Sequence, residues 1–272
     1  MKLGIAMTLP HSTAEEWAEK HKNFGCESVI FPCDFNDDDK KINSYIKAAN
    51  DYGLTIAEVG AWCNTMSQDQ SKENIEYCKK QLELADYVGA ICCVNIAGTS
   101  GGDIWDGAYK ENFLYSTYER TVEITREIID SVNPTRTHYS LEPMPYMVPY
   151  SPQNYRQLIT DVNRDAFGVH LDIINMINTP KKYFFNTEFT NKCFDILGCD
   201  ILSCHLKDIR LERGLTLNLK ETACGNGTFD IKNYIFQAEK INSNMPMIIE
   251  HLSDEQSYKT TVQYIKSILQ EN

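Results

Sequence analysis

Short runs of apolar residues recur along the chain, and each run ends in polar or turn-forming residues. Runs of about four to eight such residues are typical of buried strands, and their alternation with helical patterns favours a parallel sheet. The pattern predicts strands at residues 3–7, 28–31, 54–59, 91–96, 138–142, 167–172, 201–207 and 247–250.

Stretches with helical periodicity separate these runs. The first is introduced by a capping box, in which Thr13 is the N-cap and Glu16 stands three residues later. The others are expected around residues 42–52, 75–85, 118–128, 154–162, 188–197, 231–240 and 255–269. This alternation over 272 residues predicts an α/β protein with a single (β/α)8 TIM barrel domain, residues 1–272. A doubly wound open sheet is the alternative, but it usually carries G-x-G-x-x-G after its first strand, and this sequence does not.

Two connections are longer than the others, and long loops on a rigid scaffold tend to carry function. One is the glycine-rich segment 98–106 with Trp105, and the other is the loop 211–230. Aromatic residues are concentrated after the fourth and fifth strands. We expect Phe113 and Tyr115 to belong to the core, and Tyr146 with the rest of segment 146–150 to form a substrate wall or a protein interface.

The composition is that of a globular protein with a reduced interior. Hydrophobic residues make up 42% of the chain, and no apolar run approaches the roughly 18 residues of a membrane span. The N-terminus enters a strand directly, so we expect a cytoplasmic protein. The ten cysteines include no C-x-x-C pair and are expected to be reduced thiols. A net charge of −12 argues against a nucleic-acid partner.

The last four predicted strands each end in a residue that can bind a metal: Glu142, Asp172, His205 and Glu250. In a barrel these strand ends meet at one rim, where barrel enzymes place their chemistry. Four separate structural contacts are the alternative, but unpaired carboxylates beside buried strands would raise one another's pKa values, and a divalent cation compensates them. Three carboxylates and one imidazole suit Mn²⁺, Mg²⁺, Co²⁺ or Fe²⁺, and Zn²⁺ also fits.

Several neighbouring residues are further candidates. Lys207 shares a strand face with His205 and could neutralise an oxyanion or a carboxylate. His170 shares a strand face with Asp172. It could hydrogen-bond to a metal ligand, donate a hydrogen bond to the substrate, or be a core histidine. Glu221 could reach the site from the long loop, whereas His251 alternates away from Glu250 and is expected to be structural.

The chain resembles the sugar phosphate isomerase/epimerase superfamily of xylose-isomerase-like barrels, which includes ketose 3-epimerases, inosose dehydratases and hydroxypyruvate isomerases. The segments that carry the resemblance are Leu141-Glu142-Pro143, Gly168-Val169-His170-Leu171-Asp172, Cys204-His205-Leu206-Lys207-Asp208, Gly225-Asn226-Gly227-Thr228-Phe229-Asp230 and Ile249-Glu250-His251-Leu252. The resemblance implies one divalent metal, Mn²⁺ first among the candidates, held by Glu142, Asp172, His205 and Glu250. It further implies Lewis-acid formation of an enediolate from a keto-sugar, with Glu142 and Glu250 as both ligands and acid/base groups.

The sequence departs from the ketose 3-epimerases at three positions. Val148 and Asn175 stand where those enzymes carry a glutamate and a histidine, and Leu211 stands where they carry an arginine, with Arg210 next to it. These differences put strict ketohexose 3-epimerisation in doubt. The expected substrate-binding residues are Trp105, Tyr146, Asn175, Arg210 and Glu221, and the expected catalytic residues are Glu142, Glu250, Lys207 and His170.

A second enzymatic hypothesis uses the same enediolate to expel the substituent of a 3-oxo-glycoside. Metal-dependent deglycosidases of this superfamily are similar and can work with a small all-β partner subunit, so we expect a homo-oligomer or such a hetero-oligomer. An endonuclease of the endonuclease IV type uses the same barrel but needs a cluster of several metals and a basic surface that faces DNA. The six histidines and the net charge of −12 of this chain argue against it. A catalytically inactive scaffold is the non-enzymatic alternative.

Overall fold

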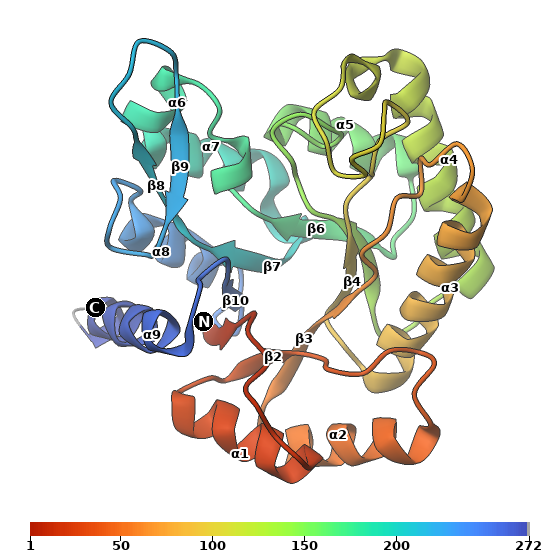
Figure 1. Ribbon diagram of the computed structural model, residues 1–272, viewed down its shortest axis with the longest axis vertical. Coiled ribbons are helices and arrows are strands. Elements are labelled where there is room, and N and C mark those ends of the chain that lie inside the picture. The colour runs from red at the N-terminus through yellow and green to blue at the C-terminus, as the bar shows by residue number, and fades with distance from the viewer. Residues whose placement is uncertain (271–272) are drawn as a thin grey trace.

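The computed structural model describes residues 1–270 and contains a sheet of eight parallel strands that forms the centre of the molecule (Figure 1). Neighbouring strands follow the order β1-β10-β7-β6-β5-β4-β3-β2. Their bounds are β1 Lys2–Ile5, β2 Ser28–Ile30, β3 Thr55–Gly60, β4 Cys92–Asn95, β5 His138–Leu141, β6 Phe167–Leu171, β7 Ile201–Leu206 and β10 Pro246–Ile249. Each of these eight strands lies where the sequence predicts one, so the expected barrel is confirmed.

The barrel is nearly closed between β1 and β2. No continuous ladder joins these strands, but the backbone N–H of Glu27 donates to the carbonyl of Leu3 at 2.7 Å, and the Ser28 hydroxyl donates to the carbonyl of Lys2 at 2.9 Å. A side chain at Gly4 would lie about 2.6 Å from the carbonyl oxygen of Ser28. Glycine therefore allows the two strands to approach at this seam.

Helices surround the strands and bury their apolar faces against them (Figure 1). The helices are α1 Ala14–Phe24, α2 Asp39–Asp51, α3 Ser71–Val88, α4 Tyr115–Val132, α5 Pro152–Val162, α6 Pro180–Phe184, α7 Asn186–Leu197, α8 Ile231–Ile241 and α9 Glu255–Gln270, with short 3-10 helices η1 Lys110–Phe113, η2 Ile174–Met176 and η3 Gly198–Asp200. The predicted cap of α1 is present, because the Thr13 hydroxyl accepts from the N–H of Glu16 at 3.1 Å. No helix within residues 1–270 is long and apolar enough to cross a membrane.

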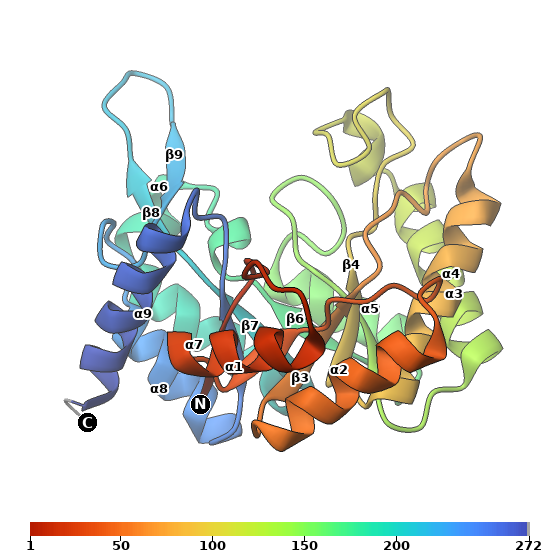
Figure 2. The same cartoon turned by 60° about the horizontal axis from the view of Figure 1, so that its bottom comes forward.

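The segment predicted as a loop at 211–230 is partly a β-hairpin, which corrects that expectation. Its antiparallel strands are β8 Asp208–Leu211 and β9 Leu219–Thr222. Figure 2 shows the hairpin and the segment between β4 and α4 projecting from the same side of the molecule. At the base of the hairpin the buried Asp208 carboxylate accepts from the backbone N–H groups of Ile209, Gly225, Gly227 and Phe229 at 2.8–3.0 Å.

The expectation that Phe113 and Tyr115 belong to the core is wrong. Their exposed fractions are 56% and 73%. Phe113 ends η1 and Tyr115 begins α4, so both precede the turns of α4 that face the barrel. Their rings pack on the surface instead, Phe113 against Tyr150 and Tyr115 against Tyr118.

Candidate metal centre and cavity

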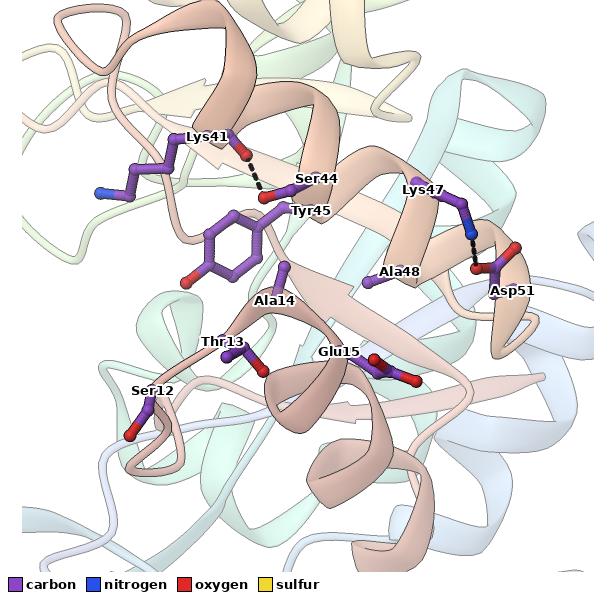
Figure 3. A pocket seen from close by; sticks show the side chains of 10 residues that line it. All are labelled: Ser12, Thr13, Ala14, Glu15, Lys41, Ser44, Tyr45, Lys47, Ala48 and Asp51. Carbon is purple, nitrogen blue, oxygen red and sulfur yellow. Dashed lines mark hydrogen bonds and ion pairs between the residues drawn. The ribbon is translucent and has the colours of Figure 1, made fainter.

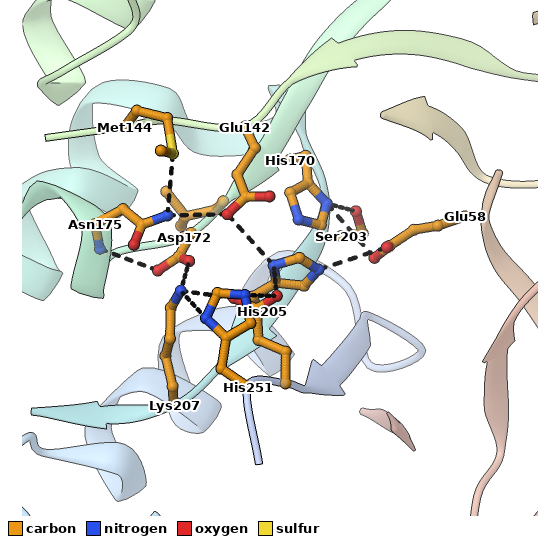
Figure 4. A network of polar contacts seen from close by, with 12 residues as sticks. Glu58, Glu142, Met144, His170, Asp172, Asn175, Ser203, His205, Lys207 and His251 are labelled. Atoms are coloured by element: carbon orange, nitrogen blue, oxygen red, sulfur yellow. Dashed lines mark hydrogen bonds and ion pairs between the residues drawn. The ribbon is translucent and has the colours of Figure 1, made fainter. Parts of the chain in front are cut away.

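Four adjacent strands bring Glu142, Asp172, His205 and Glu250 together. Figure 4 shows Glu142, Asp172 and His205 in this arrangement. Glu142 and Asp172 directly follow β5 and β6, His205 lies near the end of β7, and Glu250 directly follows β10. One possible ligand atom from each residue lies within 4.8 Å of the others, and all four side chains are buried. The order β5-β6-β7-β10 in the sheet accounts for this convergence, because the carboxyl ends of parallel strands share one rim.

His205 and Lys207 connect the carboxylates. His205 Nδ1 lies 3.0 Å from Glu250 Oε2 and 3.6 Å from Glu142 Oε1. Lys207 Nζ lies 2.7 Å from Asp172 Oδ2 and 2.6 Å from Glu250 Oε1, although neither contact has the angle of a hydrogen bond. Lys207 is only 2% exposed, and burial opposes its charge, but Asp172 and Glu250 hold its pKa well above the ordinary value. It is therefore a buried cation beside the four candidate ligands.

Several buried atoms of the site have no hydrogen-bond partner of good geometry within the described part of the chain. They include Asp172 Oδ2, Glu250 Oε1 and both ring nitrogens of His205. Burial raises the pKa of Asp172 to about 8, against the opposing effect of Lys207. Carboxylate oxygens and imidazole nitrogens are atoms that divalent transition metals bind in proteins. The residues present therefore fit such an ion.

The two candidate acid/base groups are held in their charged form. Burial is the largest effect and opposes the ionisation of Glu142, but the charge and the polar contact of His205 together with the charge of His170 outweigh it, so the pKa of Glu142 is lowered. Burial also opposes the ionisation of Glu250, but His205 and Lys207 together hold the pKa of Glu250 well below its ordinary value. Asn175 also donates to Glu142 Oε1 at 2.9 Å. Both glutamates can therefore accept a proton at neutral pH.

A cavity of about 650 Å³ opens above these groups at the carboxyl ends of the strands. Its lining includes Trp105, Tyr146, Asn175 and Glu221, which the sequence predicted as substrate-binding residues. Three of the candidate ligands, Glu142, His205 and Glu250, also line it, together with Ala6, Ile30, Trp62, Ile96, Asp106, Met144, Pro145 and His251. Aromatic walls and a charged floor suit a ligand with both apolar and polar faces.

Four predicted site residues lie outside this lining. Asp172 is fully buried beside Lys207. His170 is fully buried beside His205, with the ring centroids 4.1 Å apart, and its Nδ1 pairs with the Ser203 hydroxyl at 2.6 Å. Lys207 lies beside the ligands, where it contacts Glu221 as well. Arg210 is on the hairpin, where its guanidinium pairs with Glu212 at 2.8 Å. The roles assigned to these residues stay predictions.

Sequence reasoning missed three residues of the site: His251, Trp62 and Glu58. His251 was expected to point away, but its φ of 56° ends the strand alternation, and its Nδ1 lies 2.7 Å from Glu221 Oε2 at the cavity wall. Trp62 follows β3 and could have been found as an aromatic residue after a strand end. Glu58 is 1% exposed inside β3, and the signal for it was a lone carboxylate within an apolar run.

A second hollow, of about 630 Å³, lies between α1 and α2 (Figure 3). Its lining residues are Ser12, Thr13, Ala14, Glu15, Lys41, Ser44, Tyr45, Lys47, Ala48 and Asp51. Polar groups there are used locally, for example between Lys47 and Asp51. Within residues 1–270, both groups of side chains that could hold a metal contain His205, and no member of either group lines this hollow.

Comparisons with known proteins agree with this architecture. A family model described as a xylose isomerase-like TIM barrel matches residues 18–268. No curated protein matches the sequence.

Solved structures with this fold share 13–17% of their residues with the chain. A D-psicose 3-epimerase from Clostridium cellulolyticum H10, solved with D-tagatose, superposes with a TM-score of 0.71 at 14% identity, covering 100% of this chain and 99% of that one. The 3-keto-D-glucoside 4-epimerase of E. coli has a TM-score of 0.70 at 14% identity, covering 98% of this chain and 99% of that one. A xylose isomerase-like protein from Mycobacterium smegmatis, solved with magnesium, has a TM-score of 0.70 at 17% identity, covering 96% of this chain and 90% of that one.

Proposed function

Because the chain belongs to the xylose isomerase-like TIM barrel family, we propose that it is a divalent-metal-dependent sugar isomerase or epimerase. The reaction would remove a proton next to the carbonyl of a keto-sugar or sugar derivative and return it after an enediolate has formed. The observation that carries the proposal is that Glu142 and Glu250 both line the cavity floor beside His205 and Asp172. A D-psicose 3-epimerase and a 3-keto-D-glucoside 4-epimerase have the same fold, which supports this class of reaction.

Glu142, Asp172, His205 and Glu250 would hold the ion, which supplies Lewis-acid polarisation of the substrate carbonyl when bound. Mn²⁺ is our first candidate, and the relative solved with magnesium makes Mg²⁺ the second. Glu142 and Glu250 come from different strands and both line the cavity, where a carboxylate oxygen of each could take a proton. One would remove the substrate proton and the other would deliver one to the opposite face.

Other residues would bind and orient the substrate. Trp105 and Tyr146 present rings to the apolar face of a sugar, while Asn175 and Glu221 offer groups that bind hydroxyls. Lys207 would keep Asp172 and Glu250 in place and offset their negative charge. These walls would also reduce the access of water to the reacting carbon.

Deuterium exchange tests this proposal. The chain is loaded with Mn²⁺ and incubated in D₂O with D-fructose, D-tagatose or D-psicose, and recovered sugar is examined by NMR and mass spectrometry. We expect exchange at the carbon next to the carbonyl and a loss of about 10²- to 10⁴-fold in rate for Glu142→Gln and Glu250→Gln. Glu212→Gln is the matched control, because Glu212 pairs with Arg210 on the hairpin and does not line the cavity. Unchanged exchange in both site variants would contradict the assignment of these glutamates.

A second candidate is elimination of the aglycone from a 3-oxo-glycoside. The observation that favours it is a hollow of about 270 Å³ that shares Pro145, Asn175 and Glu221 with the main cavity and is otherwise lined mainly by Ile174, Ile177, Ile209, Leu217 and Leu219. An apolar aglycone would fit such a lining. Incubation with a 4-nitrophenyl 3-oxo-glucoside separates the two reactions, because elimination releases 4-nitrophenol and epimerisation does not. Repeating the assay with a small all-β partner subunit tests whether the lyase needs one.

A further inference from the structure

Carboxylates lie on both sides of the His205 ring, and Figure 4 shows Glu142 on one side and Glu58 on the other. Its Nδ1 faces Glu250 and Glu142 at 3.0 and 3.6 Å, and its Nε2 faces Glu58 Oε2 at 3.5 Å. The first group belongs to the candidate metal centre. Glu58 lies on β3, away from the four strands that carry that centre.

The chemistry of imidazole connects the two sides. A neutral imidazole has one lone pair and one N–H, so if Nδ1 offers its lone pair to a metal, Nε2 carries the proton. That N–H would point toward Glu58. In the opposite tautomer the proton would lie on Nδ1, among the ligands, and no lone pair would face the ion.

We propose that Glu58 is a positioning residue that accepts the Nε2–H of His205 and thereby keeps the Nδ1 lone pair directed at the metal. The inference rests on the proposed metal centre. The 3.5 Å separation is slightly longer than the ~2.7–3.2 Å of a formed hydrogen bond, and Nε2 of His205 has no other partner. A carboxylate behind a metal-binding histidine raises its basicity and fixes its orientation.

The setting of Glu58 suits this role. Its backbone is held in the barrel wall, where its carbonyl accepts from the N–H of Phe31 at 2.8 Å and β3 pairs it with Cys92. The side chain is 1% exposed. A buried carboxylate without a compensating partner is costly, and a donated N–H provides one.

The group of Glu58, His170 and His205 could also be considered as a second metal site. Two features argue against it. With one ion already bound at Nδ1, His205 would have to bind the second ion through Nε2. The ring would then carry no proton on either nitrogen and would be an imidazolate anion. The His170 nitrogen nearest Glu58, Nδ1, is already paired with the Ser203 hydroxyl at 2.6 Å. A single ion with a supporting carboxylate needs neither change.

NMR of the unmodified chain tests the tautomer directly. The protein is labelled with ¹⁵N-histidine and loaded with Zn²⁺, which is diamagnetic, and the His205 signals are assigned by their loss in His205→Gln. We expect the proton on Nε2 and the coordinated lone pair on Nδ1. A proton on Nδ1, or coordination through Nε2, would overturn the proposal.

Metal affinity provides a second readout. Chelator competition should give a Kd that is about 10- to 100-fold weaker for Glu58→Met than for the parent. Glu58→Gln is the conservative control, since its amide oxygen can still accept the N–H, and it should stay within about threefold of the parent. Parent affinity in Glu58→Met, or two ions per parent chain of which Glu58→Gln loses one, would contradict the positioning role.

Failure of this inference can be separated from failure of the metal centre. Asp172→Ala should abolish binding if the centre is correct, whatever the role of Glu58. If Asp172→Ala binds the ion like the parent, the proposed centre is wrong. If it loses the ion and Glu58→Met does not, only the role of Glu58 is wrong. Circular dichroism shows whether Glu58→Met folds, and if it does not, the NMR result on the unmodified chain decides.

Discussion

Asp172 carries the clearest conflict between charge and burial in the site. Its side chain is fully buried, and burial raises its pKa to about 8 from an ordinary value of 3.8. The folded, metal-free chain therefore keeps a proton on Asp172 at pH values where the unfolded chain has released it. As the pH rises from about 4 to about 8, this group lowers the free energy of unfolding.

We therefore expect metal-free protein to lose stability across this pH window relative to Asp172→Asn, whose side chain does not ionise. Urea unfolding in the presence of a chelator, at pH steps from 5 to 8, measures the difference between the two variants. Saturating Mn²⁺ should remove the loss in the parent, because the ion replaces the proton as the compensating charge. Parallel stability curves for the two metal-free proteins would show that Asp172 does not titrate in this range.

The residues of the site differ in how visible they are in the sequence. Glu142, Asp172, His205 and Glu250 could be selected because each closes an apolar run, and the barrel places such ends together. Glu58 could not be selected from the sequence, because its proposed role depends on which side of His205 it faces. That position follows from the packing of β3 across the barrel interior, which periodicity does not report.

The hairpin β8–β9 shows the same limit for an element. The sequence predicted the length and position of this connection, but not its strands. Its base is set by distant contacts of Asp208 with backbone groups up to 21 residues away. A Cβ on Gly227 would collide with the Asp208 carboxylate, which explains the glycine only once the contact is known.

Asp208 should accordingly stabilise the hairpin base. Asp208→Ala leaves four backbone N–H groups without their acceptor, and we expect a loss of about 3 kcal/mol or more in the free energy of unfolding. Asp208→Asn is the matched control, since one amide oxygen can still accept part of this set, and its loss should be smaller. Chemical denaturation measures the stability, and limited proteolysis reports cleavage at segment 212–218. Equal stability of Asp208→Ala and the parent would refute this account.

At the scale of the whole molecule, the metal should act as a stabilising ligand of the fold. Its candidate ligands come from four strands that span half of the barrel, so unfolding would release the ion. At about 100 times its Kd a ligand adds roughly 2.7 kcal/mol, which corresponds to roughly 5–10 °C in Tm for a chain of this size.

Scanning calorimetry with and without a chelator measures this shift. Asp172→Ala should show the same Tm in both conditions, because it lacks one ligand, whereas Glu212→Gln should shift like the parent. A parent that melts at one temperature with and without chelator would count against the centre.

The walls of the cavity and its floor come from different parts of the chain. The candidate ligands lie at the ends of β5, β6, β7 and β10, while Trp62, Trp105, Tyr146 and Glu221 come from the connections that follow strands. Substitutions, insertions or exchanges in these connections can therefore alter the shape and polarity of the cavity walls without disturbing the four candidate ligands. Such a division would let the cavity walls diverge in sequence while the set of candidate ligands stays the same.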